Sequence, residues 1–229
     1  MKNKIIVLDF AGTLIKREII EEANELRSKI LQRSLPSRKE HANPEKLYKV
    51  NREFVNKLTG IEDKFIINYR ENDGRFMKLT GEQMQNQIAT NLFQLGMYII
   101  AHKYKSKIIR EGFVKELQRE KRLGYQLAII SGVRTDIISG MLQIARLPVK
   151  FDYIYGQPPI LGMEVQEESV KDLRKHGSIK YTIGDKISDL ERIPEAKKIF
   201  FKGGHEAGGE EKFADFTIKK AKELERIIK

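Results

Sequence analysis

The chain has 229 residues, and 43 basic against 32 acidic side chains give it a formal net charge of +11. Forty per cent of the residues are hydrophobic, which is enough to form a core and excludes a disordered chain. No cysteine is present, so disulfides, thiolate metal sites and cysteine nucleophiles are excluded. No apolar stretch approaches the ~20 residues of a membrane span, and no signal-peptide pattern precedes the first apolar run. We therefore expect a cytoplasmic protein without a membrane partner.

The positive charge is spread along the chain. Residues 16–108 and the rest of the chain carry nearly equal shares of it, and most Lys and Arg residues alternate with Glu, as on solvated helix surfaces. Nucleic-acid-binding proteins usually concentrate their basic residues, and neither a basic cluster nor a base-stacking motif is present. We therefore expect no nucleic-acid partner.

The first predicted element is a strand. Residues 4–10 form an apolar, β-branched run that ends at Ala11-Gly12-Thr13, and a continuous run of this kind predicts a strand buried on both faces of a parallel sheet. Residues 14–104 then show helical spacing, with a helix that ends before Pro36, a second after Pro44 and a long third from Thr80 to about His102. Residues 61–77 are ambiguous. We expect residues 16–104 to form an all-helical domain.

Strands and helices alternate after residue 108. Apolar runs predict five further strands, and helical spacing predicts helices before and between them, at 109–123, 135–146 and 167–176. The strands are expected at 125–130, 151–155, 179–183, 198–201 and 216–218. This alternation predicts a doubly wound α/β domain with a parallel sheet, formed by residues 1–15 and 105–229, into which residues 16–104 are inserted.

Polar side chains follow three of the predicted strands: Asp9, Ser131 and Asp185. The carboxyl ends of parallel strands meet at one edge of the sheet, which is where open α/β sheets bind ligands. Asp189 follows Asp185 by four residues and can return to this edge from the next turn. We therefore expect three carboxylates and one hydroxyl to converge there.

Three neighbouring carboxylates repel one another unless a cation neutralises them. Oxygen ligands favour Mg²⁺, which prefers a substrate phosphate as a further partner, and a carboxylate beside it can attack phosphorus. The Ser131 hydroxyl, the Gly132 N–H and the turn amides after Asp9 can hold the phosphoryl oxygens. The pattern predicts a phosphoryl-transfer site.

These residues resemble the motifs of a known family. Asp9-Phe10-Ala11-Gly12-Thr13 resembles the first motif of haloacid dehalogenase-like (HAD) hydrolases, Ser131 matches the second, and Gly184-Asp185-Lys186-Ile187-Ser188-Asp189 resembles the fourth. The resemblance spans residues 4–202, and the insertion lies where this family places a helical cap. It implies a Mg²⁺-dependent hydrolase with a Rossmann-like core, a cap domain and a small phosphorylated or phosphonate substrate.

The resemblance also implies a role for each matching residue. Asp9 would attack the phosphoryl group and form an aspartyl-phosphate, and Ser131 would bind the transferred group. Mg²⁺ would be held by Asp9, the Ala11 carbonyl and Asp185, with Asp189 as a direct or water-mediated support. The remaining contacts to the substrate would come from the turns, at Phe10, Ala11, Gly12, Thr13 and Gly132.

Two positions depart from the family pattern. Phosphatases of this family carry a second Asp two residues after the nucleophile, which protonates the leaving group and then activates water; here that position is Ala11. The third motif, a Lys or Arg before the fourth, is absent from residues 163–168; Lys171, one turn later, is the nearest candidate for this catalytic role, and Lys186 is a substitute.

Ala11 leaves two alternatives to a phosphatase. The Asp-x-Ala-Gly-Thr motif resembles phosphonoacetaldehyde hydrolases, which cleave a C–P bond through a Schiff base on a cap lysine, for which Lys57 and Lys64 are candidates. The second alternative is a HAD-like binding or regulatory domain with little turnover. His205, in a glycine-rich loop, is a further acid/base candidate.

Overall fold

The structure is a computed structural model that describes residues 3–34, 66–70, 76–157, 165–203 and 209–229. The chain divides into two compact units. The first contains Met1–Glu21, Met97–Pro158 and Met163–Lys229, and the second contains Glu22–Gly96 and Pro159–Gly162. The helix expected after Pro44 lies outside the described residues.

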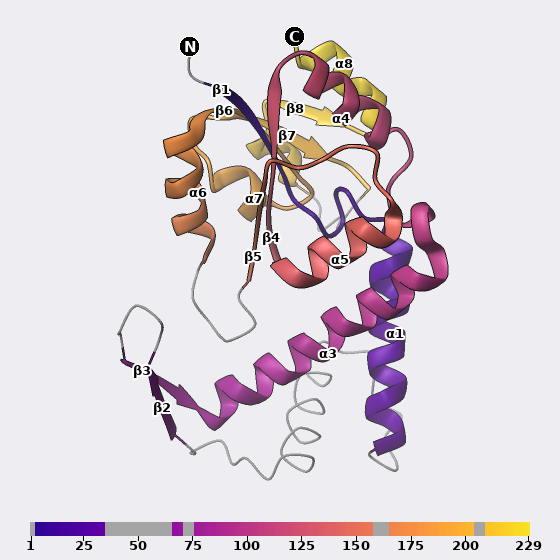
Figure 1. The fold of residues 1–229 in the computed structure, drawn as a ribbon, viewed down its shortest axis with the longest axis vertical. Helices are drawn as coiled ribbons and strands as arrows, with labels where there is room; N and C mark the ends of the chain where they lie inside the picture. The colour runs from indigo at the N-terminus through magenta and orange to yellow at the C-terminus, as the bar shows by residue number, and fades with distance from the viewer. Residues whose placement is uncertain (1–2, 35–65, 71–75, 158–164, 204–208) are drawn as a thin grey trace. The chain divides into compact units, whose positions relative to one another are not determined.

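The first unit is built on a six-stranded sheet, in which each described pair of neighbouring strands is parallel (Figure 1). The predicted parallel α/β sheet is therefore confirmed. In spatial order the strands are β5 (Tyr153–Gln157), β4 (Tyr125–Arg134), β1 (Asn3–Leu8), β6 (Gly177–Gly184), β7 (Lys197–Phe201) and β8 (Phe216–Ile218).

Helices cover both faces of β1, the central strand. Ile5 and Val7 pack with Val170 and Leu173 of α6 (Val165–His176). Successive side chains of a strand point to opposite faces, so Ile6 and Leu8 face the other side, where they are equally buried. Figure 1 shows α6 on one side of the sheet, with α4 (Phe113–Arg122) and α8 (Leu224–Ile227) on the other.

The remaining elements follow the expected order. They are the helices α1 (Arg17–Ser34), α3 (Gly81–Tyr104), α5 (Thr135–Ala145) and α7 (Ile187–Glu191), and 3₁₀ turns at Lys105–Ile108, Glu210–Phe213 and Ala221–Glu223. Among the described residues, no helix is both long and apolar enough to cross a membrane.

The start of α4 differs from the prediction, which placed it at Ile109. The segment before α4 is extended because it pairs with the chain that leaves β1: Lys16 N–H donates to Ile108 O at 2.9 Å and Arg110 N–H to Leu14 O at 3.0 Å. The helix begins only after Gly112, whose φ of 85° breaks the extended course.

The second unit is not all-helical, so this part of the prediction was wrong. Ile66–Arg70 (β2) and Phe76–Thr80 (β3) form a two-stranded antiparallel sheet, with Ile66 opposite Thr80 and Arg70 opposite Phe76. Both segments contain β-branched or aromatic residues, and the five residues between them include the Asn72-Asp73-Gly74 turn signal. The described part of the ambiguous stretch therefore belongs to two paired strands.

The second unit also contains parts of α1 and α3, which contact each other closely. A Cβ at Gly96 would lie 3.4 Å from Ala23 O, so the two helix backbones approach to van der Waals contact here. About one turn further along the two helices, the Arg27 guanidinium lies 5.5 Å from the centre of the Phe93 ring. Both helices continue into the first unit.

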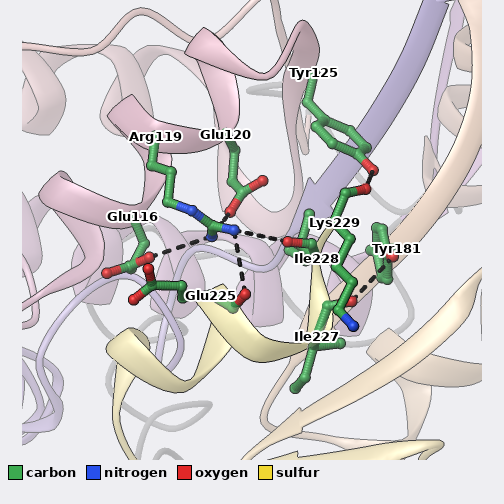
Figure 2. Close-up of polar contacts among 9 residues, drawn as sticks. All are labelled: Glu116, Arg119, Glu120, Tyr125, Tyr181, Glu225, Ile227, Ile228 and Lys229. Atoms are coloured by element: carbon green, nitrogen blue, oxygen red, sulfur yellow. Dashed lines mark hydrogen bonds and ion pairs between the residues drawn. The ribbon is translucent and has the colours of Figure 1, made fainter.

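Arg119 of α4 ties the last residues of the sequence to the core (Figure 2). Its guanidinium donates to Ile228 O at 2.8 Å and Glu225 O at 3.2 Å. The Tyr125 hydroxyl donates to Lys229 O at 3.1 Å, beside this contact. The segment that ends the sequence is thus held by side chains of α4 and β4.

Two buried carboxylates share this single arginine. Glu120 Oε1 lies 2.6 Å and Glu116 Oε2 3.6 Å from Arg119 Nη1, and the side chains of Glu120 and Glu116 are 1% and 2% exposed. Burial raises the pKa of Glu120 to about 7, against the opposing effect of Arg119 and with a further increase from Glu116. Glu120 therefore takes up a proton near neutral pH.

This raised pKa predicts that stability falls as pH rises. The unfolded chain releases the Glu120 proton near pH 4.5 and the folded chain near pH 7, so the free energy of unfolding decreases between these values and then levels off. Glu120→Gln should raise the free energy of unfolding at pH 8 by about 1–3 kcal/mol and flatten its dependence on pH. Chemical denaturation at pH 5.5 and 8 measures both effects. The exposed Glu225→Gln is the control, and an equal pH dependence in wild type and Glu120→Gln would contradict the assignment.

Candidate active site

Two of the predicted carboxylates follow neighbouring strands of the sheet. Asp9 comes directly after β1 and Asp185 directly after β6, and the two strands pair through Leu8 and Ile183. The Asp9 N–H donates to Ile183 O at 2.9 Å, so the ladder extends one residue further. Asp185 is completely buried and Asp9 is 8% exposed.

The third carboxylate reaches the same edge because α7 packs tightly onto the end of β6. A Cβ at Gly184 would lie 2.3 Å from the Asp189 Cβ, so only glycine permits this approach. The Thr182 hydroxyl donates to Asp189 O at 3.1 Å and holds α7 (Ile187–Glu191) against β6. The convergence of Asp9, Asp185 and Asp189 is therefore built into the chain between β6 and α7.

Ser131 lies beside Asp9, as the sequence predicts, but within a strand rather than after one. β4 continues to Arg134, which pairs with Gln157, and the register shifts between Ile130 and Arg134. The Ser131 hydroxyl donates to Asp9 Oδ1 at 3.1 Å. The expected turn is thus an irregularity inside β4, on which Gly132 is exposed.

The turn after Asp9 supports Asp185. Gly12 has a φ of 96°, and a Cβ there would lie 2.2 Å from Asp185 Oδ2. The Thr13 hydroxyl donates to Asp185 Oδ1 at 3.3 Å. Phe10 is completely buried in the core, so a contact to substrate at this position is left to the main chain. Ala11 brings no titratable group to the turn.

The three aspartates form a cluster that suits a cation. One carboxylate oxygen from each lies within 4.8 Å of those of the others. Burial, followed by the charges of Asp189 and Asp185, raises the pKa of Asp9 well above its usual value, although Ser131 and Arg192 act in the opposite direction. Among the described residues, the buried Asp189 Oδ2 has no hydrogen-bond partner. A hard cation with oxygen ligands would relieve this repulsion and fill the missing contact.

Arg192 is a basic residue of the site that the sequence patterns did not single out. It donates to Asp189 Oδ1 at 3.1 Å and to Ile130 O at 3.1 Å, and its side chain is 8% exposed. It also lowers the pKa of Asp9. Its position three residues after Asp189 was the available signal, because residues three apart lie on one side of a helix.

Arg110 supports the turn after Asp9 from a distant part of the chain. It donates to Gly12 O through two nitrogens, at 2.7 and 3.0 Å, and to Gly203 O at 2.9 Å. No local pattern marks Arg110 in the sequence, since both partners are main-chain carbonyls about a hundred residues away.

The basic residues that the sequence predicted for the site form no ion pair with the aspartates among the described residues. Lys171 is exposed on α6, and none of the contacts found among the described residues joins it to the aspartates. Lys186, which precedes α7, is also exposed, and its charge lowers the pKa of Asp189. Lys57, Lys64 and His205 lie outside the described residues.

The fold of the whole chain is similar to that of several solved structures. A HAD-like hydrolase of Streptococcus pneumoniae aligns with a TM-score of 0.61 at 16% identity, over 99% of both chains. A phosphoserine phosphohydrolase-like protein of Francisella tularensis gives 0.60 at 20% identity, over 100% of both. A Bacillus subtilis protein, described as a candidate HAD hydrolase bound to magnesium, gives 0.59 at 12% identity, over 100% of this chain and 99% of that one.

The chain has the fold of the HAD-like hydrolases. Its parallel sheet has the Rossmann-like arrangement that the motif resemblance implied. No family model and no curated protein matches the sequence. At identities of 20% or less these structures establish the HAD fold, and the chemistry must be argued from the residues of the site.

The aspartate cluster predicts that a divalent cation stabilises the protein. Binding to the folded state alone raises the free energy of unfolding, so saturating Mg²⁺ should raise the melting temperature by about 2–8 °C. Asp185→Asn should remove most of this increase, whereas the exposed Asp136→Asn should preserve it. Thermal melts with Mg²⁺, and with Na⁺ at equal ionic strength, measure the effect. The prediction fails if wild type shows no specific increase or if Asp185→Asn retains it.

Proposed function

We propose that this protein is a Mg²⁺-dependent hydrolase that transfers the phosphoryl group of a small phosphorylated substrate to Asp9 and then to water. The observation that carries the proposal is the pairing of Ser131 with Asp9 beside Asp185 and Asp189 at the carboxyl edge of the sheet. The HAD fold and its phosphatase-like neighbours agree with it.

Asp9 is the proposed nucleophile. The hydrogen bond from Ser131 and the N–H···O contact to Ile183 hold its carboxylate at the end of β1. One carboxylate oxygen attacks phosphorus, a P–O bond to Asp9 forms, and the bond to the leaving group breaks with the electron pair on the departing oxygen. Water then attacks phosphorus, the bond to Asp9 breaks, and inorganic phosphate leaves.

The oxygen-rich cluster fits Mg²⁺, which would balance the negative charge of the carboxylates and the phosphoryl group. Asp9, Asp185 and Asp189 would hold it, together with the Ala11 carbonyl. Ser131 and the Gly132 N–H would bind the transferred group, and the amides of the turn after Asp9 would share this role.

In the same scheme Arg192 replaces the third-motif cation that was expected at Lys171. Its guanidinium is already committed to Asp189 and lies close enough to lower the pKa of Asp9. It would hold Asp189 in position and offset the charge that builds up at Asp9 during transfer.

Ala11 shapes the expected reactivity. A positioned acid/base typically contributes 10²–10⁴-fold, and no side chain at residue 11 supplies it. Good leaving groups should therefore react fastest, and hydrolysis of the aspartyl-phosphate should be slow.

Ala11 also supports a second candidate function, which is C–P bond cleavage of a phosphonate aldehyde by a Schiff base on Lys57 or Lys64. Borohydride trapping in the presence of the aldehyde would reveal this Schiff base. A binding domain with little turnover is the third.

Asp9→Asn should abolish turnover. With p-nitrophenyl phosphate and Mg²⁺, the variant should lose more than about 10³-fold in kcat, because an amide oxygen is a far weaker nucleophile. The exposed Asp136→Asn should remain active. Unchanged turnover in Asp9→Asn, at an unchanged melting temperature, would refute the nucleophile assignment.

Arg192 should affect turnover more than folding. Arg192→Met should lower kcat by about 10²-fold, because the positive charge beside Asp9 and Asp189 is lost, and Arg192→Lys should recover part of it. Steady-state rates and melting temperatures of both variants measure this. Equal rates in the Met and Lys variants would show that the charge is not used.

A further inference from the structure

A hollow lies in the first unit, and its lining contains none of the three aspartates. It encloses about 490 Å³. Five of the residues that line it are basic, against two acidic residues, Glu18 and Glu111. The basic residues are Lys16, Arg110, Lys219, Lys220 and Lys222. We call this hollow the basic cavity.

The basic cavity lies at the same edge of the sheet as the aspartates. Phe201 is the last residue of β7, and residues 219–222 directly follow β8. Lys16 lies beyond the end of β1, and residues 110–112 immediately precede α4. Each lining segment thus follows a strand or precedes a helix, which is where α/β sheets bind ligands.

Arg110 joins the basic cavity to the turn after Asp9. Three of its contacts go to the carbonyls of Gly12 and Gly203, and its guanidinium lies 5.0 Å from the centre of the Phe201 ring. Neutral carbonyls accept these bonds and fix the positive charge in place, with Asp185 and Glu18 as the acidic side chains close enough to raise its pKa. Burial lowers the pKa of Arg110, and the negative charge of Asp185 raises it by a smaller amount.

The lysine-bearing segment is fixed as well. The N–H groups of Lys219 and Lys220 donate to Glu223 Oε1, at 3.0 and 2.7 Å. Ile218, just before them, accepts a bond from the Lys202 N–H at 2.8 Å. The side chains of Lys219 and Lys222 extend from this ordered backbone and are exposed. The cavity therefore presents an excess of positive charge on a preformed frame, which suits a multiply charged anion.

We propose that the basic cavity binds a phosphate group other than the one transferred to Asp9. Lysine and arginine side chains on two sides match the several acceptor oxygens and the charge of a phosphate, and the volume admits a small phosphorylated molecule. This group belongs either to the substrate, as its second phosphate, or to a separate phosphorylated effector. The first of these sources rests on the proposed function.

Calorimetric titration of inorganic phosphate tests the site without turnover. EDTA is present, so that divalent cations do not recruit phosphate to the aspartates. Wild type should bind phosphate, Lys219→Gln/Lys222→Gln should bind it at least about fivefold more weakly, and Lys180→Gln/Lys197→Gln should match wild type. The control pair removes the same charge from exposed residues outside the cavity. Absence of binding in wild type at low salt, or equal affinity in wild type and the cavity variant, overturns the proposal.

Kinetics then identify the source of the phosphate. If it belongs to the substrate, Lys219→Gln/Lys222→Gln raises KM for a sugar bisphosphate about fivefold or more and leaves KM for p-nitrophenyl phosphate unchanged. If both KM values stay unchanged while the calorimetric site is lost, the site serves a separate effector. A protein inactive towards both compounds would contradict the proposed function but would leave the calorimetric result standing.

Discussion

The mutual repulsion of three buried carboxylates is the constraint on which the rest of this site depends. Asp9, Asp185 and Asp189 are brought within 4.8 Å by the ends of β1 and β6 and by a helix that only glycine at residue 184 allows to approach. Burial and this repulsion raise the pKa of Asp9, and a positive partner would lower the free energy of the arrangement. Arg192 supplies part of the positive charge. The carboxylate oxygens are ligands that a hard divalent cation prefers.

Excess buried charge occurs at two places in the first unit, and it is balanced differently at each. At Arg119, two buried glutamates share one arginine, and the raised pKa of Glu120 lets a proton remove the excess charge. The carboxyl edge of the sheet carries an excess of negative charge at the aspartates and an excess of positive charge in the basic cavity. Arg110, which lines the cavity, is hydrogen-bonded to the turn after Asp9. This edge is therefore suited to a ligand that brings both a cation and phosphate oxygens.

The sequence predicted the site residues that follow strand ends, and it missed the features that depend on contacts between distant parts of the chain. Asp9 and Asp185 were recognisable because each follows an apolar strand, and such ends meet in a parallel sheet. Ser131 was placed next to Asp9, but the continuation of β4 through it was not foreseen, since pairing of Arg134 with Gln157 decides it. The antiparallel pairing of β2 and β3 was not predicted, because the sequence pattern there was short and ambiguous. Arg110 could not be found, because its acceptors are backbone carbonyls.

Asp9 is proposed to carry the phosphoryl group, and Ala11 makes this intermediate directly measurable. Without an acid/base at residue 11, the second step should be slower than the first, so the phosphoenzyme should accumulate. Rapid mixing with p-nitrophenyl phosphate and Mg²⁺ should give a burst of about one p-nitrophenol per protein, and mass spectrometry after acid quenching should find a hydroxylamine-sensitive phosphoryl group on Asp9. Turnover without a burst and with no phosphoryl group on the Asp9 peptide would contradict the account.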